Sequence, residues 1–166
     1  MYPDTYKLIM QALTFALLFG FALMARADDD AERLAQYRLD TATFKKMELA
    51  LTNLAAAVQT DPSLAQDPES EDDMDTIAAM SAFYSARPPL RAAIERSGLS
   101  VDAFSLCLMA WVQASIAHGF SEHLPPESRA KMLADSGVPA ANVEFVKANK
   151  DYLKRLEPKL KALSQG

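Results

Sequence analysis

The chain has 166 residues, half of them hydrophobic, with 17 Lys and Arg against 22 Asp and Glu and a formal net charge of −5 at pH 7. That length suits a single domain, and the acidic balance argues against nucleic acid as a partner, because phosphate binding needs a concentrated basic surface. A single cysteine excludes an internal disulfide. Glycine is scarce and β-branched residues form no alternating run, so helices should dominate.

Residues 1–27 have the pattern of a targeting segment. An apolar run at 8–25 is followed by a small-x-small cleavage site at 25–27, which is typical of a secretory signal peptide. The same run, as a helix of about 27 Å, is also long enough for an uncleaved transmembrane anchor, and both alternatives stay open. In either case Lys7 lies before the run and acidic residues follow it, so residues 28–166 are expected in the periplasm, exported or anchored to the inner membrane. A buried N-terminal helix of a cytosolic protein is a third alternative, disfavoured because no polar face runs along the segment.

The next part of the chain predicts an arm and then a bundle. Residues 28–39 are charged and predict an exposed lead-in arm, which leaves 40–166 as the helical bundle domain. Asp40 or Thr41 can accept the free amides of a first helical turn. The apolar residues that follow are spaced by three and four, which places them on one helical stripe: Phe44, Met47, Leu51, Leu54 and Val58. Pro62 is expected to end this helix.

An acidic stretch and two short helices come next. Residues 61–75 contain seven acidic residues and no basic one. The stretch fails the spacing of a calcium loop, because Asp72 and Ala78 occupy the positions that need glycine and glutamate, so a solvated loop is predicted. Helices are predicted at 75–87 and at 89–97, bounded by prolines and a glycine.

The stretch at 101–117 is the most apolar part of the chain after residue 27. Thirteen of its seventeen residues are apolar and point all round a helix, so neighbours must surround it. Ser100 is the predicted N-cap, and His118 and Gly119 are expected to stop or weaken the helix. We therefore predict an all-α bundle of five or six helices around a central apolar helix at about 100–118, preceded by the N-terminal hydrophobic helix.

The last helix supplies the one surface that we interpret as a candidate interaction face. After a short helix that carries Met132, it is expected to begin at 139–142 and to continue toward the chain end, with a kink or break at Pro158. Its exposed side is basic, and we call these residues the basic face: Lys147, Lys150, Lys154, Arg155, Lys159 and Lys161. Such a face can meet anionic lipid headgroups or an acidic partner.

Residue types capable of chemistry are few. His118 and Glu122 are four apart, as ligands on one helical face would be, with His123 beside them, but a metal needs three or four ligands. Cys107 lies among apolar neighbours, where a thiolate is disfavoured, so a buried inert thiol is predicted. No haem attachment motif or glycine-rich phosphate loop occurs. The expectation is a protein with no catalytic residue, no metal and no cofactor.

Part of the pattern resembles a group of bacterial proteins. The residues that carry the resemblance are Tyr37-Arg38-Leu39, the apolar stripe from Phe44 to Leu54, Asp61-Pro62, Pro89, Gly98-Leu99-Ser100, the apolar helix, and Asn142-Val143-Glu144-Phe145-Val146 with Asn149. Together they are similar to uncharacterised, exported, all-helical bacterial proteins of about this length, over residues 37–163. The resemblance implies the fold and the location, and it implies no activity.

These observations favour an interaction protein. We expect a non-catalytic, periplasm-facing accessory subunit associated with an inner-membrane protein complex, such as a respiratory or photosynthetic one. Its expected partners are that complex or the membrane surface, with no nucleic acid and with a small-molecule ligand disfavoured. The alternative is a soluble periplasmic binder of a small apolar ligand or metal inside the bundle. A hydrolase would need a cleft that converges on His118 or His123.

Overall fold

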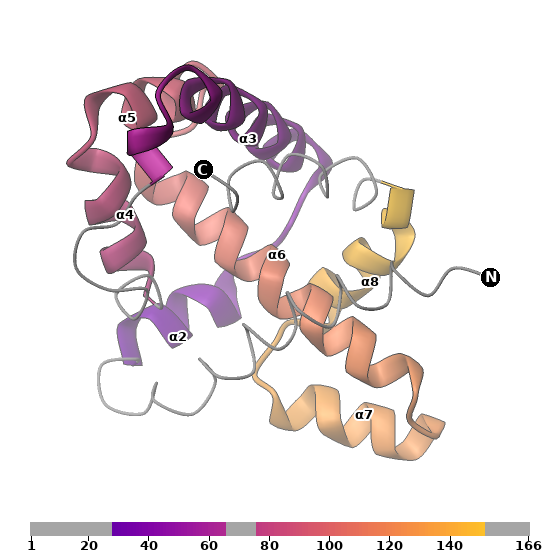
Figure 1. Ribbon diagram of the computed structural model, residues 1–166. Helices are drawn as coiled ribbons and strands as arrows, with labels where there is room; N and C mark the ends of the chain where they lie inside the picture. Colours follow the sequence, from indigo (N-terminus) through magenta and orange to yellow (C-terminus); the bar gives the residue numbers. More distant parts are fainter. Residues whose placement is uncertain (1–27, 66–75, 152–166) are drawn as a thin grey trace.

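The computed structural model describes residues 28–65 and 76–151 (Figure 1). In these two ranges all the regular secondary structure is helical, which confirms the predicted all-α class. The elements are α2 (Asp28–Gln36), α3 (Thr41–Thr60), the 3₁₀ turn η1 (Pro62–Ala65), α4 (Ile77–Ser85), α5 (Pro88–Glu95), α6 (Val101–Glu122), α7 (Pro126–Asp135) and α8 (Ala140–Ala148). The predicted N-terminal hydrophobic helix and most of the acidic stretch lie outside the described residues.

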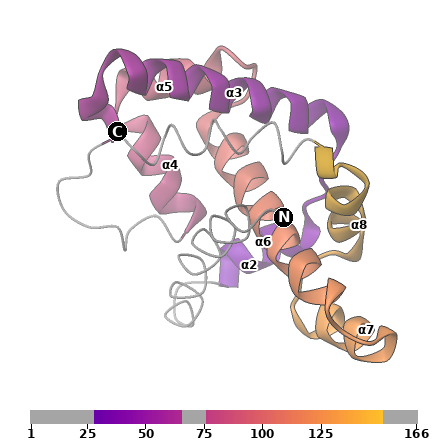
Figure 2. The same cartoon turned by 45° about the vertical axis from the view of Figure 1, so that its right-hand side comes forward.

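Helix α6 is the centre of the fold. It runs obliquely through the middle of the molecule, and α2, α3, α4, α5, α7 and α8 all contact it (Figures 1 and 2). The Ser100 hydroxyl accepts a hydrogen bond from the Ala103 amide at 3.1 Å, as the predicted N-cap requires. The expected stop at His118 and Gly119 is wrong, because α6 continues to Glu122. A glycine inside a helix costs only about 1 kcal/mol, and the burial of the neighbouring Ala117 and Ser121 offsets such a cost.

The charged lead-in is a docked helix, α2, where the sequence predicted an exposed arm. Its charges have specific partners: the Asp30 carboxylate accepts the Ile77 amide at 2.9 Å, and the Arg33 guanidinium donates to the Asp102 carboxylate at 2.7 Å. Leu34 is buried in the core. The described chain therefore contains seven α-helices where five or six were expected, and α2 is the additional one.

The core joins α3, α6 and α8. The predicted stripe of α3 is buried along its whole length, which confirms the spacing argument. At its first turn the Phe44 ring lies 6.3 Å from the Trp111 ring of α6 and 5.5 Å from the Phe145 ring of α8, measured between centroids. Aromatic pairs at these separations add to the apolar burial, so Phe44 links three helices.

Local chemistry sets several helix ends. Asp40, not Thr41, caps α3, and its carboxylate accepts the Ala42 and Thr43 amides at 2.9 Å. The hydrogen bonds from Thr43 hold the pKa of Asp40 below its ordinary value. After α5 the chain turns at Gly98, whose φ of 80° lies in the left-handed region that favours glycine.

Helix α8 ends earlier than predicted. The sequence pattern continued to a kink at Pro158, but α8 stops at Ala148 with Asn149 as its C-cap at φ −115° and ψ 29°. The Asn149 side-chain amide donates to the Phe145 carbonyl at 2.7 Å, so its own side chain takes part in ending the helix. A new helical turn starts at Lys150. Pro158 lies outside the described residues.

Candidate functional site

Two of the residues that the sequence singled out for chemistry, His118 and Glu122, lie together in the last turns of α6, which approach the end of α8. The His118 Nε2 atom lies 3.4 Å from the Glu122 Oε1 atom, so their four-residue spacing does place them on one face. The same carboxylate oxygen accepts a hydrogen bond from the Lys150 Nζ atom at 2.6 Å. We call His118, Glu122 and Lys150 the polar cluster. Its ion pair attaches Lys150, two residues beyond the end of α8, to the last turn of α6.

Burial governs the electrostatics of the polar cluster. The His118 side chain is only 10% exposed, and its Nε2 atom makes no hydrogen bond. Desolvation therefore lowers the pKa of His118, and the nearby Lys150 and Lys147 lower it further, against the opposing effect of Glu122. The hydrogen bond from Lys150 lowers the pKa of Glu122. The fold therefore favours a neutral imidazole beside an ion pair.

Metal binding would need further ligands at this point. His123 follows Glu122 in the sequence but is exposed at the C-cap of α6. In residues 28–65 and 76–151, no three His, Cys, Asp or Glu side chains are grouped as a metal ion needs. The polar cluster is an ion pair beside a buried imidazole, and its chemistry is that of a proton-linked contact between two helices.

The polar cluster predicts a pH dependence of stability. The pKa of His118 is lowered in the folded state, so its stabilising contribution is fully present above its ordinary pKa of 6.5 and is lost as the pH falls through the folded-state pKa. Urea unfolding at about pH 7.5 and about pH 5.5 should therefore show a stability loss that His118→Gln reduces. Glu122 has the same sign, but its window lies below its ordinary pKa of 4.5.

His123→Gln is the control, because it removes the neighbouring exposed imidazole and keeps His118. The stability loss on acidification should persist in this variant. If His118→Gln and the unmodified chain lose the same stability on acidification, the assignment to His118 is wrong.

Cys107 is fully buried, as predicted, in the middle of α6. Its thiol forms a hydrogen bond with the Tyr37 hydroxyl, and burial raises the pKa of Cys107 to about 11. Burial, and then the thiol itself, also raises the pKa of Tyr37. Both groups are therefore neutral at physiological pH, and together they attach the segment after α2 to the central helix.

The described part of the basic face is exposed but paired. Lys147 and Lys150 are 56% and 51% exposed, and they bind Glu144 at 3.5 Å and Glu122 at 2.6 Å. Their charges are thus compensated locally. Lys154, Arg155, Lys159 and Lys161 lie outside the described residues.

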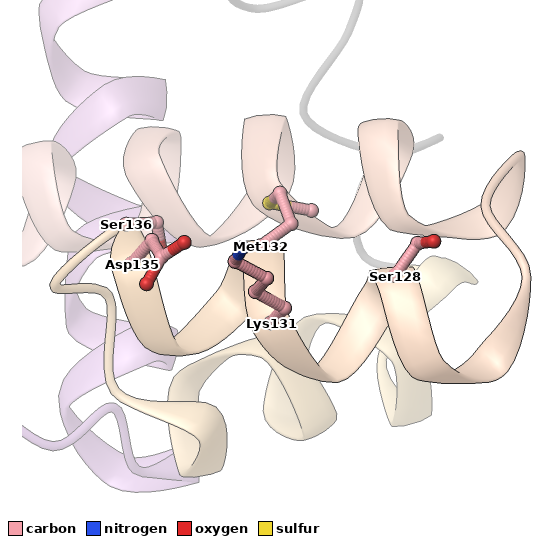
Figure 3. A pocket seen from close by; sticks show the side chains of 5 residues that line it. All are labelled: Ser128, Lys131, Met132, Asp135 and Ser136. Carbon is pink, nitrogen blue, oxygen red and sulfur yellow. The ribbon is translucent and has the colours of Figure 1, made fainter.

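A shallow hollow of about 460 Å³ lies on α7, the helix at one end of the molecule beside the C-terminal half of α6. Its lining residues all belong to α7 or its C-cap: Ser128, Lys131, Met132, Asp135 and Ser136. Figure 3 shows them strung along one helix, with Ser128 and Ser136 far apart. Side chains from a single helix do not converge on a ligand as those of a binding cleft do.

The sequence predicted neighbours on every side of α6, but one side of this helix is incompletely covered. A row of apolar side chains along this side is only half-buried, and the last of them is 46% exposed. We call this row the α6 stripe: Leu108, Met109, Val112, Ile116 and Phe120. Among the described helices, α6 alone is long and apolar enough to cross a membrane by length and composition, a property that core helices of soluble proteins share. Its place among six other helices supports the core role (Figure 1).

Comparison of the chain with protein-family models, with curated proteins and with solved structures found no match. Its function is therefore argued from its own residues.

Proposed function

We propose that this protein is a non-catalytic interaction subunit that works on the periplasmic side of the inner membrane, in association with a membrane protein complex. Residues 8–25 direct it there, as a cleaved signal peptide or as a retained anchor, and the basic face docks against the anionic headgroups around its partner. The bundle built on α6 is the rigid support for this face.

The observation that carries the proposal is that α8, together with the residues directly after it, has a buried side and an exposed basic side. Asn142, Val143 and Val146 are buried against the core, whereas Lys147 and Lys150 are more than half exposed. From Lys147 to the chain end there are six Lys and Arg against two Asp and Glu, a balance of +4 in a chain whose net charge is −5. A local excess of this kind, against the sign of the whole protein, favours an anionic surface as the partner.

The pairing of Lys147 and Lys150 refines which residues dock. Glu144 and Glu122 compensate these two lysines, whereas the sequence after Asp151 contains four Lys and Arg and a single acidic residue, Glu157. Exposed ion pairs are weak and exchange readily, so both lysines remain able to reach an anionic headgroup. The docking energy should therefore come mainly from Lys154, Arg155, Lys159 and Lys161.

Charge removal tests this docking. Binding of residues 28–166 to vesicles rich in anionic phospholipid should weaken on the order of a hundredfold when Lys154, Lys159 and Lys161 become glutamine, at about 1 kcal/mol per lysine. A matched control replaces Lys45, Lys46 and Arg91, which are exposed on α3 and α5, by glutamine. Equal weakening by both sets would show a general charge effect and would contradict a defined face.

Association with a complex is tested separately, by extracting the full chain from the membranes of its own cells in mild detergent. We expect it to co-purify with a membrane protein complex of larger size. Recovery only as a free, soluble, processed monomer would rule out the accessory-subunit function.

A further inference from the structure

The α6 stripe is an apolar surface without a full cover, and the chain itself contains a segment that fits it. The stripe extends from Leu108 to Phe120, which corresponds to about 18 Å of helix. Its members are half-buried or exposed, although the opposite side of α6 is fully buried. Leaving such a row in water costs roughly 25 cal/mol for each Å² of apolar surface, so a cover is favoured.

The polar cluster fixes where the C-terminal segment begins. Helix α8 ends at Ala148, and Asn149 breaks the helical direction. Lys150, the next residue, is held by Glu122 at the last turn of α6, at 2.6 Å. The chain therefore enters the segment after Asp151 from a residue whose side chain is held at the end of α6.

The segment after Asp151 has the length and pattern to return along α6. Its leucines are spaced by three, four and three residues, which gives a row of about 15 Å if helical: Leu153, Leu156, Leu160 and Leu163. This length is close to that of the α6 stripe. Pro158 divides the row into two halves and allows a bend between them.

We propose that residues 152–163 pack their leucines on the α6 stripe. This packing completes the cover of the central helix and leaves the cations of the segment on the outside, next to Lys147. The packing rests on the proposed function in one respect only: the surface that the packing assembles is the basic face. The basic face is then built by folding the C-terminal segment back on α6, and its charges are held by the bundle.

The test measures access to the α6 stripe. A cysteine is introduced by Val112→Cys in the full chain, in the cell fraction where the protein accumulates, and its reaction rate with a water-soluble maleimide is measured. Cys107 does not interfere, because it is buried. The comparison chain also carries Leu156→Gln and Leu160→Gln. If the segment covers the stripe, these two changes should speed labelling by roughly tenfold or more, as local opening does.

Control variants distinguish cover of the α6 stripe by residues 152–163 from misfolding and from cover by another segment or partner. Ser128→Cys on the exposed surface of α7 should label equally fast with and without the two glutamines, and Trp111 fluorescence should be unchanged. Slow labelling of Val112→Cys in both chains would mean that residues 8–25, a second copy or another partner covers the stripe, and would overturn the proposal. Fast labelling in both would mean that nothing covers it, and would overturn it as well.

A second measurement identifies the covering segment directly. The double variant Val112→Cys with Leu156→Cys should form an intramolecular disulfide on oxidation, whereas a disulfide-linked dimer alone would contradict the proposal. Vesicle binding distinguishes the packing of residues 152–163 on the α6 stripe from the docking function of the basic face. Protection of Val112 without any vesicle binding supports the packing and refutes the docking function, and vesicle binding with an open stripe does the reverse.

Discussion

Phe44→Ala is expected to lower the free energy of unfolding by about 3–5 kcal/mol, the range for removing a buried aromatic ring. Phe44 is 2% exposed and contacts rings on α6 and α8, so its removal leaves a cavity between three helices. Trp111 lies against the lost ring and reports the change. Urea unfolding followed by Trp111 fluorescence and by circular dichroism measures it.

Leu49→Ala is the control, because it truncates a large apolar side chain of the same helix, α3, at a site that is 47% exposed. Its cost should be about 0.5 kcal/mol, as for most surface substitutions. Equal costs for the two variants would show that the junction of α3, α6 and α8 is not the packed core described above.

The parts of the fold that were predicted correctly depend on local chemistry. The stripe of α3 follows from a spacing of three and four residues, the cap of α6 from one hydroxyl at Ser100, and the turn after α5 from Gly98. Each signal lies within one helical turn of its effect. Such signals can be recognised without knowing which elements meet.

The errors arose where the decisive partner is distant in the sequence. The charges of α2 resembled those of a solvated arm, yet Asp30 caps the first amide of α4 and Arg33 binds Asp102. In the polar cluster the sequence found His118 and Glu122 through their spacing. It could not find Lys150, which reaches them from beyond α8.

The central helix shows how an interpretation can be correct for only part of a surface. Its uniform apolarity correctly predicted a core helix, but it also implied neighbours on every side. The α6 stripe is half-buried in the described chain. The sequence pattern predicted that the last helix continued past residue 151, with a kink or break at Pro158. In the structure α8 ends at Ala148, before the leucines that follow residue 151.

Asn142→Ala is expected to lower the free energy of unfolding by about 2–4 kcal/mol, because it leaves the buried Leu39 amide without its partner and removes one of the two side-chain bonds to the Tyr37 carbonyl, which Arg38 also donates to. The Asn142 side chain is 1% exposed; its Oδ1 atom accepts the Leu39 amide at 2.9 Å and its Nδ2 atom donates to the Tyr37 carbonyl at 3.1 Å. These bonds connect α8 to the link between α2 and α3, more than a hundred residues away in the sequence. The sequence contained Asn142 at the start of a helix without showing this role.

Asn53→Ala is the matched control for the two hydrogen bonds of Asn142, since the Asn53 side chain makes one half-buried hydrogen bond, to the Ala93 carbonyl at 3.0 Å. It should cost about 1 kcal/mol, the usual value for one hydrogen bond. Hydrogen exchange of the Leu39 amide adds a local reading, because that amide should exchange faster in Asn142→Ala than in Asn53→Ala at equal global stability. If Asn142→Ala lowers the free energy of unfolding no more than Asn53→Ala does, and the Leu39 amide stays protected, the Asn142 hydrogen bonds do not hold α8 against the α2–α3 link. The end of α8 would then be positioned by Lys150 and the apolar contacts alone.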